Sequence, residues 1–149
     1  MNRKRAALLG VGVVLVGIQV VPVDRSNPPV TGEISAPAEV RSVLERSCYD
    51  CHSNETAWPW YGYVAPASWL LARHVREARE HVNFSEWNDL GLDDRAEAFE
   101  EIAEEVDEAK MPLPSYLPLH PEARLTDAER YLLVDWAMGG AGERALPID

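Results

Sequence analysis

Five consecutive residues, Cys48-Tyr49-Asp50-Cys51-His52, have the types and spacing of a chemically active site. Written C-x-x-C-H, the pattern is typical of the covalent attachment of a c-type haem. Two thiols a helical turn apart can each add to one vinyl group of the same porphyrin, and the next histidine can coordinate the iron. Because Cys48 and Cys51 are the only cysteines among 149 residues, no further thiol exists for a disulfide or a four-cysteine metal site.

Other uses of the cysteine pair need partners that this sequence lacks. A structural zinc site requires four ligands, usually with a second C-x-x-C or an H-x₃₋₅-H. The nearest pattern is His74 with His81, which are separated by six residues. A thioredoxin-like pair would accompany alternating strands and helices, and no such alternation is present. The motif therefore predicts one covalently bound haem c per chain.

The side chain on the opposite face of the iron decides what such a haem does. A methionine raises the reduction potential, a second histidine lowers it, and an open position permits peroxide or gas chemistry. Met111 is the favoured ligand because it lies in a loop, 110–121, with four prolines in twelve residues, where it has little reason to fill a core. Packing in the last helix explains Met138. The alternatives are an open site and three histidines, His74, His81 and His120, the last of which could instead bond a haem propionate.

Aromatic residues are concentrated around the motif. Six of them lie within 21 residues, namely Tyr49, Trp58, Trp60, Tyr61, Tyr63 and Trp69. Aromatic rings shield a porphyrin from water while their polar groups reach its propionates. We expect the group to form the pocket wall, with Trp58, Trp60 and Tyr61 binding the cofactor. A carbonyl of Pro59 or Pro66 is expected to accept the Nδ1–H of His52 and so fix its ring.

The first 23 residues have the composition of a membrane or export segment. Three cations at positions 3–5 precede an apolar run over 6–23 that only Gln19 and Pro22 interrupt. As a helix the run would span about 27 Å, against about 30 Å for the hydrocarbon core of a bilayer. No convincing cleavage site follows, which favours an uncleaved anchor over a cleaved signal peptide. The order of the charges places the remainder in the bacterial periplasm, at the outer face of the cytoplasmic membrane.

The rest of the chain is expected to hold a linker and one domain. Residues 24–34 are rich in Pro, Ser, Asn and Gly and predict an extended linker that lifts the domain from the membrane. Residues 35–149 suffice for one c-type haem-binding domain. Beyond position 23, 11 cations (14 less the three at 3–5) face 25 acids, a net charge of −14. This charge argues against nucleic acid or anionic lipid as partner surfaces and suits a redox protein with a basic docking face.

Helical periodicity predicts an all-α, cytochrome c-like domain with about four helices around the haem. The expected helices cover 35–48, 67–82, 93–106 and 126–138. Ser35 is the expected N-cap of the first helix. Thr126 and Glu129 form a capping box for the last helix, which the glycines at 139–140 are expected to stop.

Several longer stretches resemble a known family. CYDCHSNETAWPWYGYVAPASWLLARHV, NFSEW, MPLPSY and LHPEARLTDAER, with the preceding NPPV, are similar to the bacterial haem-binding domain family of small exported C-x-x-C-H proteins. The resemblance covers about residues 22–140. It implies a monohaem c-type domain, with Cys48, Cys51 and His52 in the attachment positions and Met111 in the family's M-P segment.

These observations predict a one-electron carrier and not an enzyme. The iron would be ligated by His52 and Met111, and the redox partners would be other proteins. The alternative is a haem enzyme or a gas or peroxide sensor, whose distal site would be open, displaceable or bis-histidine.

Overall fold

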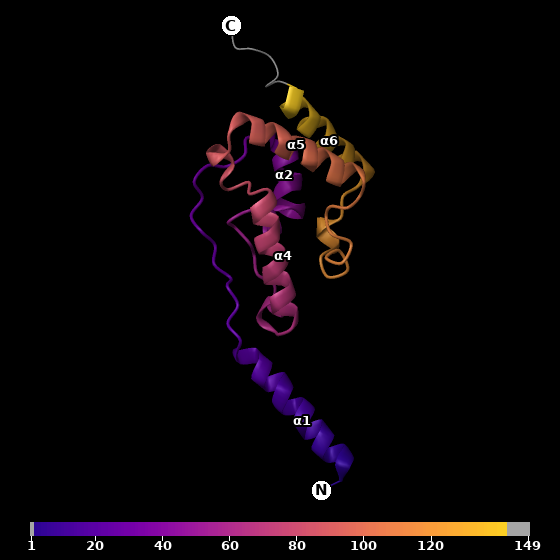
Figure 1. Ribbon diagram of the computed structural model, residues 1–149. Coiled ribbons are helices and arrows are strands. Elements are labelled where there is room, and N and C mark those ends of the chain that lie inside the picture. The colour runs from indigo at the N-terminus through magenta and orange to yellow at the C-terminus, as the bar shows by residue number, and fades with distance from the viewer. Residues whose placement is uncertain (1, 143–149) are drawn as a thin grey trace.

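The computed structural model describes residues 2–142, which form helices joined by loops (Figure 1). Within this range lie six α-helices and four short 3₁₀ turns, with no strand, so the all-α prediction is confirmed. The α-helices are α1 (Arg3–Gly17), α2 (Ala38–Ser47), α3 (Tyr49–His52), α4 (Ala67–His81), α5 (Leu92–Asp107) and α6 (Asp127–Gly142). The turns are η1 (Ile18–Val20), η2 (Trp60–Tyr63), η3 (Trp87–Asp89) and η4 (Pro121–Ala123).

The main core lies where α5 and α6 pack side by side near the end of α2 (Figure 1). Val40 and Leu44 of α2 are each 1% exposed, as their helical spacing predicts. The Phe99 ring lies between two indoles, edge-on to Trp87 at 4.8 Å and to Trp136 at 5.2 Å. Edge-to-face pairs add about 0.5–1.5 kcal/mol each beyond the burial of apolar area. This core fixes α2, and α2 ends at the first cysteine of the motif.

The helix ends agree with the sequence at one position and differ at two. The capping box is confirmed, because Glu129 Oε2 accepts the Thr126 N–H at 2.8 Å and Thr126 Oγ1 accepts the Glu129 N–H at 3.2 Å. Ser35 as N-cap was wrong, since Pro37 precedes the first helical residue. The glycines at 139–140 do not stop α6, which continues to Gly142. An interior glycine weakens a helix by about 1 kcal/mol and does not by itself end it.

Ala109 ends α5 in a left-handed conformation, with φ 57°. Its N–H bonds the Val106 carbonyl at 3.2 Å and the Lys110 N–H bonds the Glu105 carbonyl at 3.0 Å, which together form a Schellman motif. Because an alanine Cβ is strained there, we expect Ala109→Gly to raise the free energy of unfolding by about 0.5–1 kcal/mol in urea titrations. Ala96→Gly in the interior of α5 is the control and should lower it by a similar amount. If both substitutions destabilise equally, the left-handed cap is refuted.

After the three cations of its first turn, helix α1 is apolar on all sides, and none of its residues is buried. It extends away from the domain and ends beside it, where η1 continues the chain (Figure 1). No helix in the described part of the chain is both long and apolar enough to cross a membrane. The anchor or signal segment expected over residues 1–23 stays a prediction.

Residues 24–34 are extended and run along the domain surface. The N–H groups of Thr31 and Gly32 both donate to the Ser85 carbonyl, at 3.0 and 3.1 Å, and the Ile34 N–H donates to the Phe84 carbonyl at 3.0 Å. The Ile34 side chain is 2% exposed and joins the core. This segment is therefore bonded to the loop that follows α4.

Candidate functional site

The C-x-x-C-H motif lies at a break between two helices. Cys48 has φ −127° and ψ −35°, which ends α2, and the next four residues form the single turn α3. The N–H groups of Cys51 and His52 bond the Cys48 carbonyl at 3.1 and 2.9 Å. This turn places the two cysteines a helical turn apart, as attachment to one porphyrin requires.

Both cysteines are free and partly buried. Burial raises the pKa of the Cys48 thiol to about 12 and that of Cys51 to about 11. At neutral pH both are therefore thiols and not the thiolates that ligate metals or exchange disulfides. Nor do the residues from 2 to 142 include a cluster of three or more His, Cys, Asp or Glu placed to share a metal ion.

The His52 ring is held by a backbone carbonyl. Its Nδ1 lies 3.1 Å from the Val82 carbonyl oxygen, which can only accept, so Nδ1 carries the proton and Nε2 the lone pair. Burial lowers the pKa of His52, although the carbonyls of Val82 and Ala78 oppose this shift, so the ring is neutral at pH 7. The expected support from Pro59 or Pro66 was wrong, because the end of α4 supplies the acceptor.

Residues 82–84 also hold the His52 backbone. The Phe84 N–H donates to the His52 carbonyl at 2.8 Å, and the two rings lie 5.9 Å apart. The Tyr49 ring also packs on Phe84, with the ring centroids 5.5 Å apart. The loop after α4 thus fixes the position and the rotation of the imidazole, which is how metal-ligating histidines are oriented.

Behind this loop lies a partly buried polar network that the sequence analysis missed. Arg79 of α4 donates to the carbonyls of Ser53 (2.8 Å) and Ser26 (3.1 Å), and to the side chains of Asn27 (3.0 Å) and Thr56 (2.9 Å). One side chain therefore links α4, the segment 24–34 and the residues directly after His52. No sequence signal separates this arginine from the other arginines of α4, because its partners are distant in the chain.

Asn54 and Ser85 extend the network. Ser85 Oγ accepts the Asn54 N–H at 2.9 Å, while Asn54 Nδ2 donates to Pro29 O at 3.1 Å and to Glu86 Oε1 at 2.9 Å. Asn54 is 3% exposed and Ser85 is fully buried. Because these buried polar groups are paired, the chain after His52 has one preferred position.

The Pro-rich loop closes on the motif from another direction. Tyr116 Oη donates to Asp50 Oδ2 at 2.9 Å, and its ring stacks on that of His120 with centroids 3.9 Å apart. His120 Nε2 lies 2.7 Å from Tyr61 Oη, and Nδ1 lies 3.1 Å from Glu122. Both nitrogens of His120 are therefore engaged within the protein, which argues against His120 as an iron ligand.

We expect Tyr116→Phe to loosen this loop and to lower the free energy of unfolding by about 1–2 kcal/mol, because Asp50 loses its hydroxyl partner. Burial raises the pKa of Tyr116, followed in size by the effect of Asp50. A raised pKa stabilises the fold fully below the ordinary value of about 10 and progressively less above it. The difference between wild type and variant should therefore shrink above that pH. Tyr131→Phe, which alters an exposed tyrosine on α6, is the control for these urea titrations; equal effects of the two substitutions would refute the role of the Tyr116 hydroxyl.

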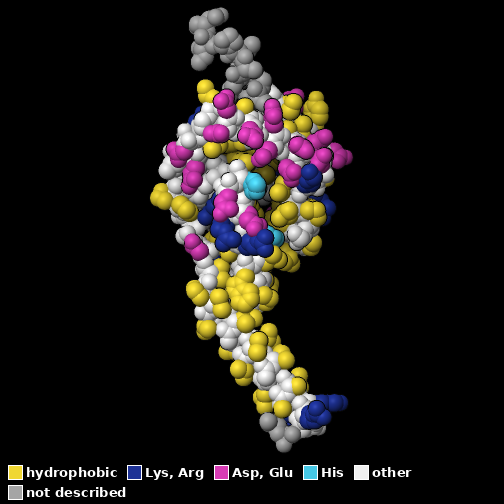
Figure 2. Space-filling model, in the orientation of Figure 1, with side chains coloured by type: hydrophobic (Ala, Val, Ile, Leu, Met, Phe, Trp, Pro, Cys, Tyr) yellow, Lys and Arg dark blue, Asp and Glu magenta, His cyan; other side chains and the backbone are white. Residues whose placement is uncertain are grey.

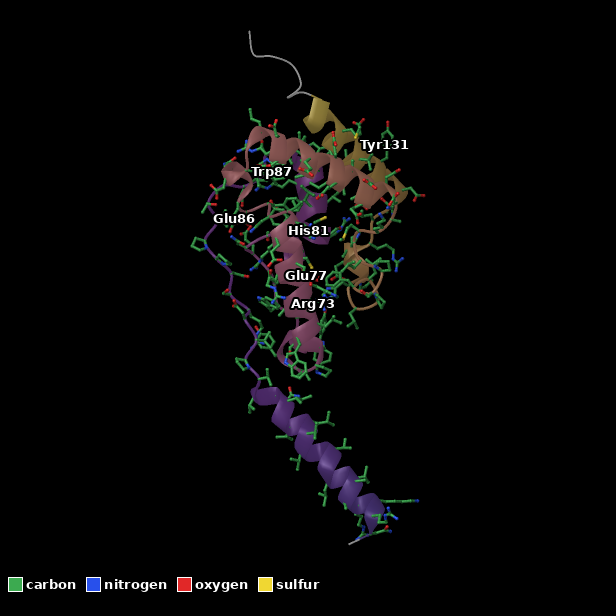
Figure 3. All side chains as sticks on the ribbon, viewed as in Figure 1. Arg73, Glu77, His81, Glu86, Trp87 and Tyr131 are labelled. Atoms are coloured by element: carbon green, nitrogen blue, oxygen red, sulfur yellow. The ribbon has the colours of Figure 1, made fainter. Side chains whose placement is uncertain are left out.

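The remaining distal candidates differ in their surroundings. Met111 is partly buried and packs against the same core as Cys48, and its N–H bonds the Glu105 carbonyl at 3.0 Å. His74 is partly buried on α4. His81 is exposed at the end of α4 (Figure 3) and precedes Val82, so it lies on the side of the site from which His52 is supported. The distal ligand stays a prediction, for which this placement favours Met111.

The structure places the residues of the predicted aromatic pocket wall in different surroundings. Tyr61 is linked to the motif through His120, which stacks on Tyr116, the partner of Asp50. Trp58 lines a cavity of about 510 Å³ between 22–28 and α4, where its indole N–H has no partner. Trp60 is 76% exposed. The assignments of Trp58 and Trp60 to the cofactor stay predictions.

The site fits a covalently held haem. It offers two free thiols one turn apart and a neutral imidazole whose Nδ1–H is bonded to the Val82 carbonyl, which leaves the lone pair of Nε2 for a metal. The model of the haem-binding domain family matches residues 13–139, which include the motif, α4 and Met111. No curated protein and no solved structure matches the chain.

Proposed function

The chain belongs to the haem-binding domain family, and from this membership we propose that it is a monohaem c-type cytochrome that carries single electrons. The observation that carries the proposal is the His52 ring, held through Nδ1 at 3.1 Å by Val82 directly beside two free cysteines. When bound, the haem supplies an iron that gains and loses one electron at a time.

Different residues of this chain hold different parts of the cofactor. Cys48 and Cys51 form the thioether links, and His52 binds the iron through Nε2. Met111 would be the second ligand to the iron, and the loop that follows it is fastened to the motif by the Tyr116 bond to Asp50 at 2.9 Å. Two ligands held by the fold suit a carrier, because little has to move when the charge of the iron changes.

The cellular setting is part of the proposal. We place the domain in the bacterial periplasm, directed there and attached to the membrane by the N-terminal segment. Support comes from three cations that precede the apolar run over 6–23. The partners are redox proteins with basic docking faces, since the net charge of the chain is −11.

An optical spectrum of the oxidised protein tests the distal assignment. We expect the weak far-red band of methionine-ligated Fe(III) in the wild type, and we expect Met111→Ala to abolish it and to open the reduced iron to CO. His120→Ala is the control and should keep the band. If the wild type lacks the band and binds CO readily once reduced, the carrier function is wrong and an enzyme or sensor with an open site replaces it.

A further inference from the structure

One end of the domain exposes a cluster of large apolar side chains, here called the aromatic end. It comprises Trp60 (76% exposed), Tyr63 (61%), Val64 (45%), Trp69 (36%) and Leu70 (57%). All five lie within 60–70: Trp60 and Tyr63 on η2, Val64 directly after it, and Trp69 and Leu70 at the start of α4. A contiguous exposed patch of this kind marks a surface that another phase or molecule covers.

The apolar helix α1 joins the domain at this same end. Gln19 Nε2 donates to the Ala65 carbonyl at 3.2 Å, and Gln19 Oε1 accepts the Ala65 N–H at 2.9 Å. Arg25 donates to the Gly62 carbonyl at 3.2 Å, and its guanidinium lies 4.7 Å from the centre of the Tyr63 ring. Figure 2 shows hydrophobic side chains along α1 up to its junction with the domain. The exposed apolar surfaces of α1 and the aromatic end are therefore neighbours.

Acidic side chains are absent from the aromatic end and are concentrated at the opposite end of the domain. Although the chain has 25 acids, none lies between 56 and 76, where Arg73 and Arg76 occur. These arginines are 65% and 66% exposed, and each pairs with a glutamate one turn further along α4. Helix α5, with eight carboxylates and one arginine, lies at the end of the domain opposite to α1 (Figures 1 and 2).

We propose that the aromatic end rests on the interface of a phospholipid bilayer, with α1 entering its apolar layer. A helix that is apolar on all sides needs an apolar environment. Trp and Tyr favour the boundary between hydrocarbon and headgroups because one end of each ring system is apolar and the other is polar. The guanidinium groups of Arg73 and Arg76, which are largely exposed beside their glutamate partners, lie next to phosphates there. This inference rests on the membrane attachment in the proposed function, and it places the domain directly on the bilayer, with Trp60 facing lipid.

A spin label on residue 63 tests the orientation in phosphatidylcholine vesicles. In the full chain with haem attached, both native cysteines are consumed, so Tyr63→Cys supplies one thiol for labelling. Tyr131→Cys is the matched control, an exposed tyrosine on α6 (Figure 3). We expect the label at 63 to be relaxed by oxygen, which partitions into lipid, and the label at 131 by a water-soluble nickel complex. An unchanged haem spectrum shows that both variants are folded.

The outcomes distinguish the orientation of the aromatic end from the membrane attachment of the proposed function. A label at 63 that reaches only the aqueous nickel complex on vesicle-bound protein overturns the aromatic-end proposal alone. A label shielded from both relaxants shows that a protein or a second copy covers the patch, which also overturns it. If the wild type does not bind the vesicles, the membrane attachment fails and the orientation with it. More than one label per chain shows free native cysteines, which contradicts covalent haem and not the orientation.

A second pair of variants measures the contribution of the rings. Trp60→Ser with Tyr63→Ser should weaken partition of the full chain into these vesicles about tenfold, because apolar area is removed from the contact. Tyr131→Ser should leave partition unchanged. Equal partition of the double variant and the wild type would overturn the proposal.

Discussion

We expect Arg79→Met to lower the free energy of unfolding by about 3 kcal/mol. The substitution keeps most of the aliphatic volume and removes four hydrogen bonds, of 2.8, 3.1, 3.0 and 2.9 Å. Two of their acceptors, Ser53 and Thr56, belong to the partly or fully buried chain after His52 and would lose a charged partner. Burial already lowers the pKa of Arg79, and the bonds to Ser53 and Thr56 are partly buried, so water replaces these two poorly.

Arg76→Met is the matched control for this measurement. Arg76 lies less than one turn away on α4, is 66% exposed and has one ion pair, to Glu80 at 3.9 Å. Exposed pairs of this kind contribute about 0–1 kcal/mol. Urea titrations of the two variants should therefore differ by about 2 kcal/mol or more. Equal midpoints would show that the Arg79 network does not hold the motif.

The second large effect is chemical. Changing both Cys48 and Cys51 to alanine should abolish covalent haem, so that acidified organic solvent extracts all of it, whereas the wild type should retain it in the protein. Either single variant should retain haem through one thioether. Mass spectrometry of the denatured chains measures this directly, as the presence or absence of one haem mass.

The control variant for this experiment is His74→Ala, which alters a partly buried histidine of α4 and leaves both thiols intact. It should retain the covalent haem mass. If the double cysteine variant also retained the mass, the attachment chemistry would lie elsewhere. If the wild type lost its haem to the solvent, the protein would bind haem without thioethers.

The sequence predicted the local parts of this structure well. The apolar spacing in α2 and the capping box at Thr126 and Glu129 depend on residues three or four apart, so short-range pattern is sufficient for them. The expected stop at 139–140 failed because glycine has only a weak intrinsic preference against helix. Ser35 failed as a cap because the chain before Pro37 is bonded to the loop after α4.

The candidate attachment site was visible in the sequence itself. Five adjacent residues supply two thiols and an imidazole, and the proposed covalent attachment needs only the spacing of one turn. What holds that imidazole was decided by the tertiary structure. The Val82 carbonyl lies 30 residues from His52, and every residue has a carbonyl, so no pattern distinguishes this one. The same reason applies to the four acceptors of Arg79 and to the contact of Gln19 with Ala65, since long-range hydrogen bonds join groups whose types are common throughout the chain.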